Sequence, residues 1–202
     1  FFGNQLIFEE INQDLNVTFL YSWCNSEKFG FIKKSKLINN DSEKKVIQVL
    51  EGIQNILPAG IDYNFQNEFS NLLDAYKKNE LMADTQLGLF TLSSVPVDRA
   101  EPSESLYATT VWNAGLHNAK VLISGNQIDS FKKGIDIDTE LDIRARRGAY
   151  FVNSALQLKA GEEKDWMLVA EINQDNAAVS DLNQFLLETK NLEHIVEEDI
   201  KA

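Results

Sequence analysis

The sequence has few of the residues on which many binding and catalytic sites depend. Its 202 residues include one cysteine, Cys24, so no internal disulfide can form and a secreted disulfide scaffold is not indicated. The two histidines, His117 and His194, have no cysteine or histidine at ligand spacing, which argues against a zinc site or other metal site. No nucleophile elbow, phosphate loop or dinucleotide fingerprint occurs, so we expect no cofactor.

Long apolar runs and an excess of basic residues are also missing. Every apolar run is far shorter than the ~20 residues of a membrane helix. The 19 basic residues face 31 acidic ones, and a net charge of -12 repels phosphate backbones and anionic lipids. Nucleic acid and membranes are therefore not expected partners, and solubility explains the charge.

The first residues, FFGNQLIFEE, contain no initiator methionine and no basic segment leading into an apolar one. A signal peptide is therefore not indicated. We expect the chain to be a piece of a longer polypeptide, either cut out or processed. The compartment stays open, with the cytoplasm favoured.

Runs rich in β-branched and aromatic residues, separated by turn residues, predict strands along most of the chain. They occupy residues 5–11, 16–23, 87–93, 106–114 and 119–123. Two further pairs of runs are interpreted as β-hairpins, over residues 29–52 around NNDS and over residues 149–172 around KAGEE. The first hairpin carries lysines expected to be exposed and to discourage edge pairing: Lys33, Lys34, Lys36, Lys44 and Lys45.

Helical patterns are fewer. Apolar spacing from Phe65 predicts a short helix that gives way to a strand near Leu72. The segment SGNQIDSFKKG predicts a short helix with Ser124 or Asn126 as its cap and Gly134 at its end.

The charged residues 135–148 are expected to form a surface connection. From Asp175 onward, apolar residues recur at intervals of three and four and predict one amphipathic helix.

The polar loop before residues 106–114 is the first candidate site, and it holds Asp98, Arg99, Glu101 and Glu104. Glycoside hydrolysis needs two carboxylates ~5 to 10 Å apart, but spacing in a loop does not fix spacing in space. A loop pinned by acid–arginine pairs explains the same residues and is favoured, and contact with a sugar or partner domain is the third interpretation. We assign no catalytic residue.

Arg144, Arg146 and Arg147 form the second candidate site, directly before a predicted strand. Their guanidinium groups could clamp a phosphate or carboxylate through bidentate hydrogen bonds. Pairing with acids of the same fold is the favoured interpretation, and the candidate partners are Asp98, Glu101 and Glu104.

Six phrases, in this order, resemble the β-sandwich region of large cellobiose-phosphorylase-like proteins: FGFIKKSKLIN, VLEGIQNILPAGI, NLLDAYKKNEL, DRAEPSESLYATTVW, IRARRGAY and AEINQD. The resemblance covers residues 23–175. It implies a mostly β fold, a supersandwich-like two-sheet antiparallel β-sandwich over residues 1–174 with a few short helices. Residues 175–202 would then be a helix that links this domain to a missing helical barrel.

In such proteins the (α/α)6 barrel carries the carboxylate chemistry on glycosidic bonds. The resemblance therefore implies a non-catalytic domain of a larger glycoside phosphorylase or hydrolase, which supports the barrel and can rim its sugar site. The implied partners are the barrel of the same polypeptide, a carbohydrate ligand and a second copy in a homodimer.

Two other classes of function stay open. A stand-alone module that binds a glycan or a protein would need an exposed aromatic platform or groove, whereas Trp23, Trp112 and Trp166 are expected to pack in the core. An autonomous enzyme resembling sugar epimerases would need paired histidines and acids, and both histidines lie outside the acidic loop.

Overall fold

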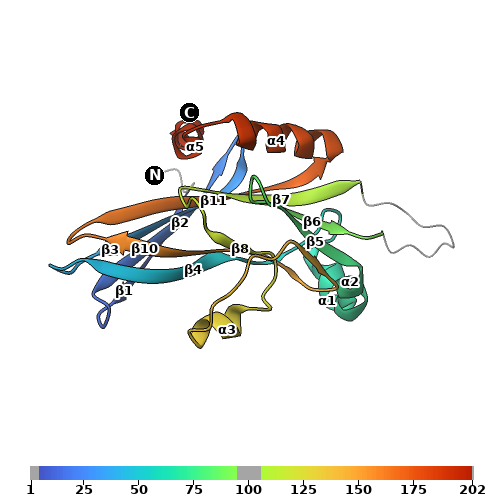
Figure 1. The fold of residues 1–202 in the computed structure, drawn as a ribbon. Coiled ribbons are helices and arrows are strands. Elements are labelled where there is room, and N and C mark those ends of the chain that lie inside the picture. The colour runs from blue at the N-terminus through green and yellow to red at the C-terminus, as the bar shows by residue number, and fades with distance from the viewer. Residues whose placement is uncertain (1–4, 95–105, 202) are drawn as a thin grey trace.

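The computed structural model describes residues 5–94 and 106–201, whose strands form two antiparallel sheets (Figure 1). The large sheet has eight strands in the order β1 (Leu6–Asn12), β2 (Val17–Ser26), β3 (Gly30–Asn39), β11 (Glu163–Asp175), β7 (Tyr107–Ala114), β6 (Leu87–Leu92), β5 (Lys77–Met82) and β9 (Asp142–Arg144). The small sheet has three, in the order β4 (Lys45–Ile56), β10 (Gly148–Leu158) and β8 (Lys120–Leu122). The predicted mostly β, two-sheet sandwich is confirmed.

The main core lies between the two sheets, because each strand turns alternate apolar side chains toward the facing sheet. Trp166, Tyr150 and Phe90 are among its largest fully buried members. Trp112 is buried on the opposite face of the large sheet, and Trp23 is partly buried. Core packing is thus confirmed for Trp112 and Trp166.

Neither predicted hairpin forms. β3 pairs with β2 and β11 in the large sheet, whereas β4 pairs with β10 in the small one. The chain therefore crosses between the sheets at residues 40–44, and it crosses back at residues 159–162, between β10 and β11. The hairpin interpretation is wrong because turn residues show where a chain reverses, but the same residues serve a turn within one sheet and an arch between two.

The side chain of Asn39 joins the two crossings. Its Nδ2 donates to the carbonyl oxygens of Glu43 at 2.8 Å, Lys159 at 2.9 Å and Leu158 at 3.3 Å. Its Oδ1 accepts a hydrogen bond from the backbone N of Asp41 at 3.1 Å. Because Asn39 is fully buried, no water can replace these bonds.

Lys33 is not an exposed edge lysine as predicted. β3 lies inside the large sheet, and the Lys33 side chain points toward β4, where it forms an ion pair with Glu51. Its Nζ also donates to the carbonyl oxygen of Gly52 at 3.2 Å and lies 4.9 Å from the ring centroid of Tyr21. Trp166 Nε1 donates to the second oxygen of Glu51 at 3.0 Å, so this buried carboxylate has a partner on each side.

Helices α1 (Tyr63–Glu68) and α2 (Ser70–Tyr76) continue past Leu72, and β5 begins at Lys77. The predicted helix is confirmed, but the strand begins later than expected. The reason is tertiary: the buried Lys77 Nζ binds Gln66 and Asp74, which holds α2 together to its last turn.

Helix α3 (Ile128–Lys132) lies in the segment predicted for it, but neither Ser124 nor Asn126 caps it. The Ser124 hydroxyl instead accepts from the backbone N of Asn126 at 3.2 Å and donates to Glu140 at 3.0 Å. Gly134 follows the helix with a φ of 72°, a conformation that glycine adopts readily.

The connection over residues 135–148 is not confined to the surface. Ile137 packs with Leu122 and Phe151 beneath α3, and Glu140 is buried against β8. The next residues form β9 at the edge of the large sheet. The surface prediction rested on the many charged residues of this segment. The apolar residues between them are too few to show a clear period, so nothing in the sequence indicated that Ile137 would be buried.

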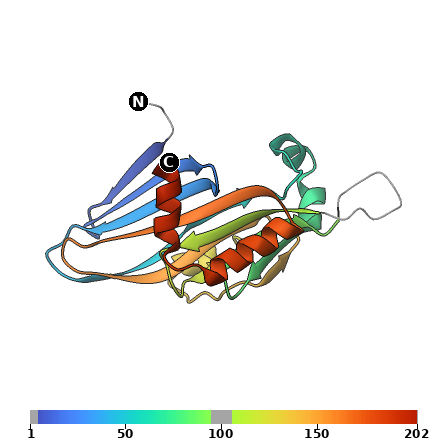
Figure 2. The ribbon, with the colours of Figure 1, turned by 90° about the horizontal axis from the view of Figure 1, so that it is seen from above.

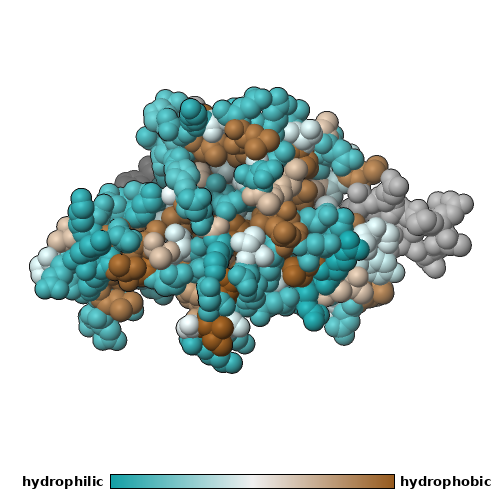
Figure 3. Space-filling view, viewed as in Figure 1, coloured by the Kyte–Doolittle hydropathy of each residue, from teal (hydrophilic) through white to brown (hydrophobic). Residues whose placement is uncertain are grey.

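The C-terminal segment forms two helices where one was predicted, α4 (Asn176–Glu188) and α5 (Leu192–Lys201). Asp175 caps α4 by accepting from the backbone N of Ala178 at 2.8 Å. Both helices lie on the outer face of the large sheet, α4 over β11 and β7 and α5 over β2 (Figure 2). In the side view, hydrophobic residues gather between these helices and the sheets, and most of that face is hydrophilic (Figure 3). No helix in the described part of the chain has the length and hydropathy to cross a membrane.

Replacing Val196 by aspartate should release α5 from the sheet. Val196 is fully buried in the same cluster as Cys24, and a carboxylate there would have to leave its apolar surroundings. Burial also raises the pKa of the Cys24 thiol, which keeps it unreactive. We expect labelling of Cys24 by a thiol reagent to become at least about tenfold faster in Val196→Asp. The exposed Glu198→Ala on the same helix is the control, and equal labelling rates for all three proteins would contradict α5 as the cover of Cys24.

Candidate functional site

The first predicted site, with Asp98, Arg99, Glu101 and Glu104, lies outside the described residues. The second site can be placed. Arg144, at the end of β9, pairs with Asp142 at 3.1 Å, and the hydrogen bond from this guanidinium lowers the pKa of Asp142. Arg144 is thus engaged within its own short strand.

Arg147 and Arg146 lie together on the loop that follows β9. Arg147 Nε lies 3.3 Å from Asp74 Oδ2, while Arg146 donates to the carbonyl oxygen of Ala145. Burial raises the pKa of Asp74, but hydrogen bonds from Lys77 and Arg147 outweigh it and hold that pKa below its usual value. Both arginines line an open pocket of about 530 Å³ together with Asp74. This carboxylate occupies the position from which Arg147 would otherwise bind an anion.

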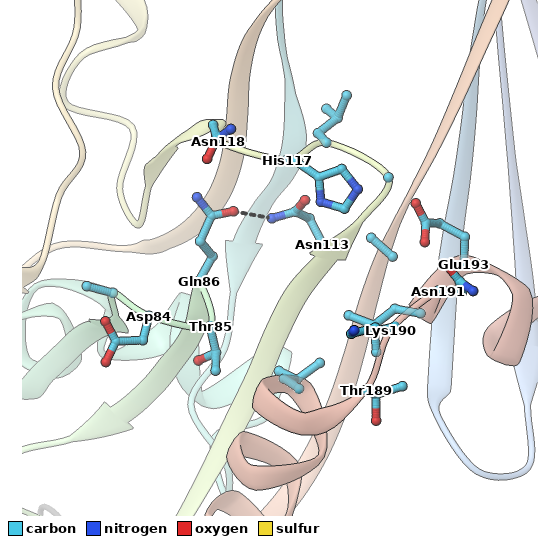
Figure 4. Close-up of a pocket in the computed structure, with 16 residues that line it drawn as sticks. Asp84, Thr85, Gln86, Asn113, His117, Asn118, Thr189, Lys190, Asn191 and Glu193 are labelled. Carbon is cyan, nitrogen blue, oxygen red and sulfur yellow. Dashed lines mark hydrogen bonds between the residues drawn. The ribbon is translucent and has the colours of Figure 1, made fainter.

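A larger depression lies at another end of the sandwich, and we call it the loop cleft (Figure 4). Three connections meet there: residues 83–86 between β5 and β6, residues 115–119 between β7 and β8, and residues 189–191 between α4 and α5. Its volume of about 610 Å³ is in the range of small-molecule sites. The turns that meet here bring together segments that are far apart in the sequence.

The floor of the loop cleft is a fixed hydrogen-bond network. Asn113 Nδ2 donates to Gln86 Oε1 at 2.8 Å, the bond drawn in Figure 4, and to Tyr150 Oη at 3.3 Å. Tyr150 Oη in turn donates to the carbonyl oxygen of Gln86 at 2.7 Å, and Gln86 Nε2 donates to that of Ala119 at 2.7 Å. Because these groups hold one another, the floor is organised before any ligand arrives.

The walls of the cleft carry amide side chains on strained turns. Gln86, Asn118 and Asn191 have positive φ angles of 56°, 59° and 61°. No side-chain hydrogen bond among the described residues involves Asn118 or Asn191, so both amides are available to a ligand. Non-glycine residues with positive φ are uncommon, and three of the seven among the described residues line this cleft, which makes it a candidate functional site.

Charged groups at the cleft are few and mixed. Figure 4 shows Asp84 and Glu193 on opposite sides, with Lys190 and His117 between them. No group of three or more histidine, cysteine or acidic side chains in residues 5–94 and 106–201 could hold a metal ion. This arrangement can bind an uncharged, hydroxyl-rich molecule through amides.

Sequence reasoning did not identify the loop cleft. The pattern of residues 115–118, GLHN, predicted only a joint between two strands, and His117 was considered only as a metal ligand or as a catalytic partner of acids in an epimerase-like enzyme. The signal that could have been used is asparagine or glycine in each of the turns GLHN and TKN, since these residues tolerate the left-handed conformation. That the turns converge is visible only in the folded chain.

Tyr150→Phe should lower the free energy of unfolding by about 1 to 1.5 kcal/mol, because the hydrogen bonds of its hydroxyl with Asn113 and Gln86 are lost.

Burial raises the pKa of the Tyr150 phenol, and the hydrogen bond from Asn113 lowers it by less. The folded state therefore keeps this proton to a higher pH than the unfolded state, whose tyrosines ionise at pH ~10. Stability should be fully present below that pH and fall as the pH rises above it. Unfolding free energies measured across alkaline pH should show a shallower fall in Tyr150→Phe, and identical slopes would contradict this.

The chain has a weak structural similarity to a solved protein and no sequence match. No protein-family model and no curated protein sequence matches the chain. Among solved structures the chain is similar to a heparinase III with methylated lysines, at 9% sequence identity and a TM-score of 0.38. The similarity covers 87% of this chain but 20% of the heparinase, so the chain spans about a fifth of that protein. A likeness at this level carries no argument about activity, ligand or partner, and the resemblance to cellobiose-phosphorylase-like proteins stays a prediction.

Proposed function

We propose that this chain is a non-catalytic β-sandwich module that binds carbohydrate at the loop cleft, as part of a larger carbohydrate-active protein. The observation that supports the proposal most is the amide lining of that cleft over a preformed floor. An amide group both donates and accepts, as a sugar hydroxyl does, so each can satisfy the other without a net charge.

The charges of the cleft also favour an uncharged ligand. Asp84 and Glu193 would repel an anion, while Lys190 lies close enough to the same surface to disfavour a cation. Leu116 and Leu186 are both buried and give the lining an apolar part, which suits the carbon face of a sugar ring. An uncharged molecule with hydroxyl groups and an apolar face satisfies all three kinds of group.

The larger protein is part of the proposal. The resemblance to cellobiose-phosphorylase-like proteins suggests that the chemistry belongs to a helical barrel of the same polypeptide, with residues 1–174 as supporting domain and residues 175–202 as the link. In that arrangement the parent is a glycoside phosphorylase or hydrolase, and a homodimer is a further proposed assembly. The size of the native polypeptide, determined in cell lysate with an antibody against this chain, tests this part.

Carbohydrate binding is tested by thermal unfolding with a panel of neutral mono- and disaccharides. A sugar present at about 100 times its Kd should stabilise the protein by about 2.7 kcal/mol. Asn118→Gly and Asn191→Gly should each weaken binding by about tenfold, because glycine keeps the positive φ while the amide is lost. Asn55→Gly, an exposed asparagine with a φ of 56° that is not part of the cleft, is the matched control. The assignment would be refuted if no sugar in the panel stabilised the protein. It would also be refuted if neither cleft variant weakened the binding of a sugar that does stabilise it.

A further inference from the structure

Strand β1 is exposed along its whole length. The exposed fractions of its aliphatic side chains are 64% for Leu6, 67% for Ile7 and 63% for Ile11, and Phe8 is 44% exposed. A soluble protein rarely leaves a contiguous apolar strand in water unless something binds it.

The apolar side chains of β1 lie on both faces of the sheet. Leu6 and Phe8 pair with Trp23 and Tyr21 on the face turned toward the small sheet, because Trp23 lies opposite the inward-pointing Lys33. Ile7 and Ile11 therefore lie on the opposite face. A helix or a sugar ring placed on one face would cover only half of these side chains. An added strand would cover both faces.

The backbone of β1 is also open to an added strand. β1 is the first strand of the large sheet, and within residues 5–94 and 106–201 it pairs with β2 alone, over seven consecutive residues without a bulge (Figure 2). Natural edge strands are usually protected by shortness, proline, lysine or a bulge. The opposite edge strand, β9, has three residues, whereas β1 has seven residues without proline, lysine or bulge, and its only charged side chains are Glu9 and Glu10.

The charges of β1 indicate which strand would fit. Glu9 and Glu10 lie at its centre, one on each face, and the strand carries no basic residue. A second copy that paired antiparallel over the full length would place Glu9 directly opposite its own counterpart, in a protein of net charge -12. A strand with basic residues at its centre would instead pair with both glutamates, and the acidic protein would attract it.

We propose that β1 is a docking strand, to which an extended, basic segment of a partner protein adds as a further strand of the large sheet. Apolar side chains of that segment cover Leu6, Phe8, Ile7 and Ile11, and lysine or arginine side chains lie opposite Glu9 and Glu10. Backbone hydrogen bonds supply affinity, and the two glutamates supply the choice of partner. This inference is independent of the carbohydrate proposal.

The test uses synthetic peptides of the length of β1, labelled for fluorescence anisotropy. One alternates threonine and valine around two adjacent central lysines, a second has glutamates in place of the lysines, and a third is the lysine peptide with N-methylated backbone amides. We expect the lysine peptide to bind at least about tenfold more tightly than either of the others at low salt. The double variant Glu9→Lys, Glu10→Lys should reverse the preference between the first two peptides. Both glutamates are exposed, so the variant should fold as the native chain does.

Three results would overturn the proposal. One is that none of the peptides binds, and another is that the N-methylated peptide binds as tightly as its parent, which would mean charge contact without strand addition. The third is that the protein itself sediments as a dimer which Ile7→Lys dissociates, since β1 would then be occupied by a second copy. Circular dichroism of each variant confirms that binding is compared between folded proteins.

Discussion

Glu51→Ala should destabilise the protein by about 3 to 5 kcal/mol, the range found when one partner of a buried ion pair is removed. Lys33 and Glu51 are both buried, and Trp166 Nε1 uses the same carboxylate as its acceptor. The variant leaves an ammonium group between two sheets with the Gly52 carbonyl and the rings of Tyr21 and Trp23 as its remaining contacts. Chemical denaturation of the native and variant chains measures the difference.

The double variant Lys33→Met, Glu51→Leu separates the pair from its packing. It removes both charges and keeps most of the side-chain volume, so we expect it to recover all but about 1 to 2 kcal/mol of the native stability. Glu163→Ala is the matched control. It breaks the exposed ion pair of Glu163 with Lys36, which lies on β3 like Lys33, and it should cost at most about 1 kcal/mol. A cost of Glu51→Ala no greater than that of Glu163→Ala would show that the buried pair is not an energetic unit.

Asn39→Ala should cost about 2 to 4 kcal/mol, because the carbonyl oxygens of both crossings lose their buried donor and Asp41 loses an acceptor. Asn40→Ala is the neighbouring control. Within the described residues the Asn40 side chain makes one hydrogen bond, to the Thr18 hydroxyl at 2.8 Å, so its loss should cost about 1 kcal/mol. Equal costs for the two variants would mean that Asn39 does not hold the arches together.

Asn39→Asp extends the same argument to pH. A carboxylate at this position would face the carbonyl oxygens of Glu43, Leu158 and Lys159, so the folded state should raise the pKa of the introduced acid. An acid whose pKa is raised on folding is most compatible with the fold when protonated, so stability should fall as the pH rises above about 4, where aspartates of the unfolded chain ionise. Unfolding free energies measured from acid to neutral pH should converge with those of Asn39→Ala at low pH. A variant equally stable at all pH values would contradict the donor role of the amide.

The local structure could be predicted where residues act through their own neighbours. The strands β1, β2, β6, β7 and β8 follow from runs of β-branched and aromatic residues, and the helix after Asp175 follows from apolar spacing at three and four. The mostly β class follows from the same patterns, and the two-sheet arrangement came from the family resemblance. The acidic surface and the lack of any disulfide follow from counting residues.

The tertiary structure alone decided which strands pair and where a site forms. Asn39 and Lys33 look like ordinary turn and surface residues in the sequence, but the arches bury one and β4 covers the other. The loop cleft depends on three turns that are far apart along the chain, and local patterns carry no information about such convergence. The physical reason is that pairing between distant strands is determined by the burial of whole faces, whereas a residue's own neighbours determine only its local conformation.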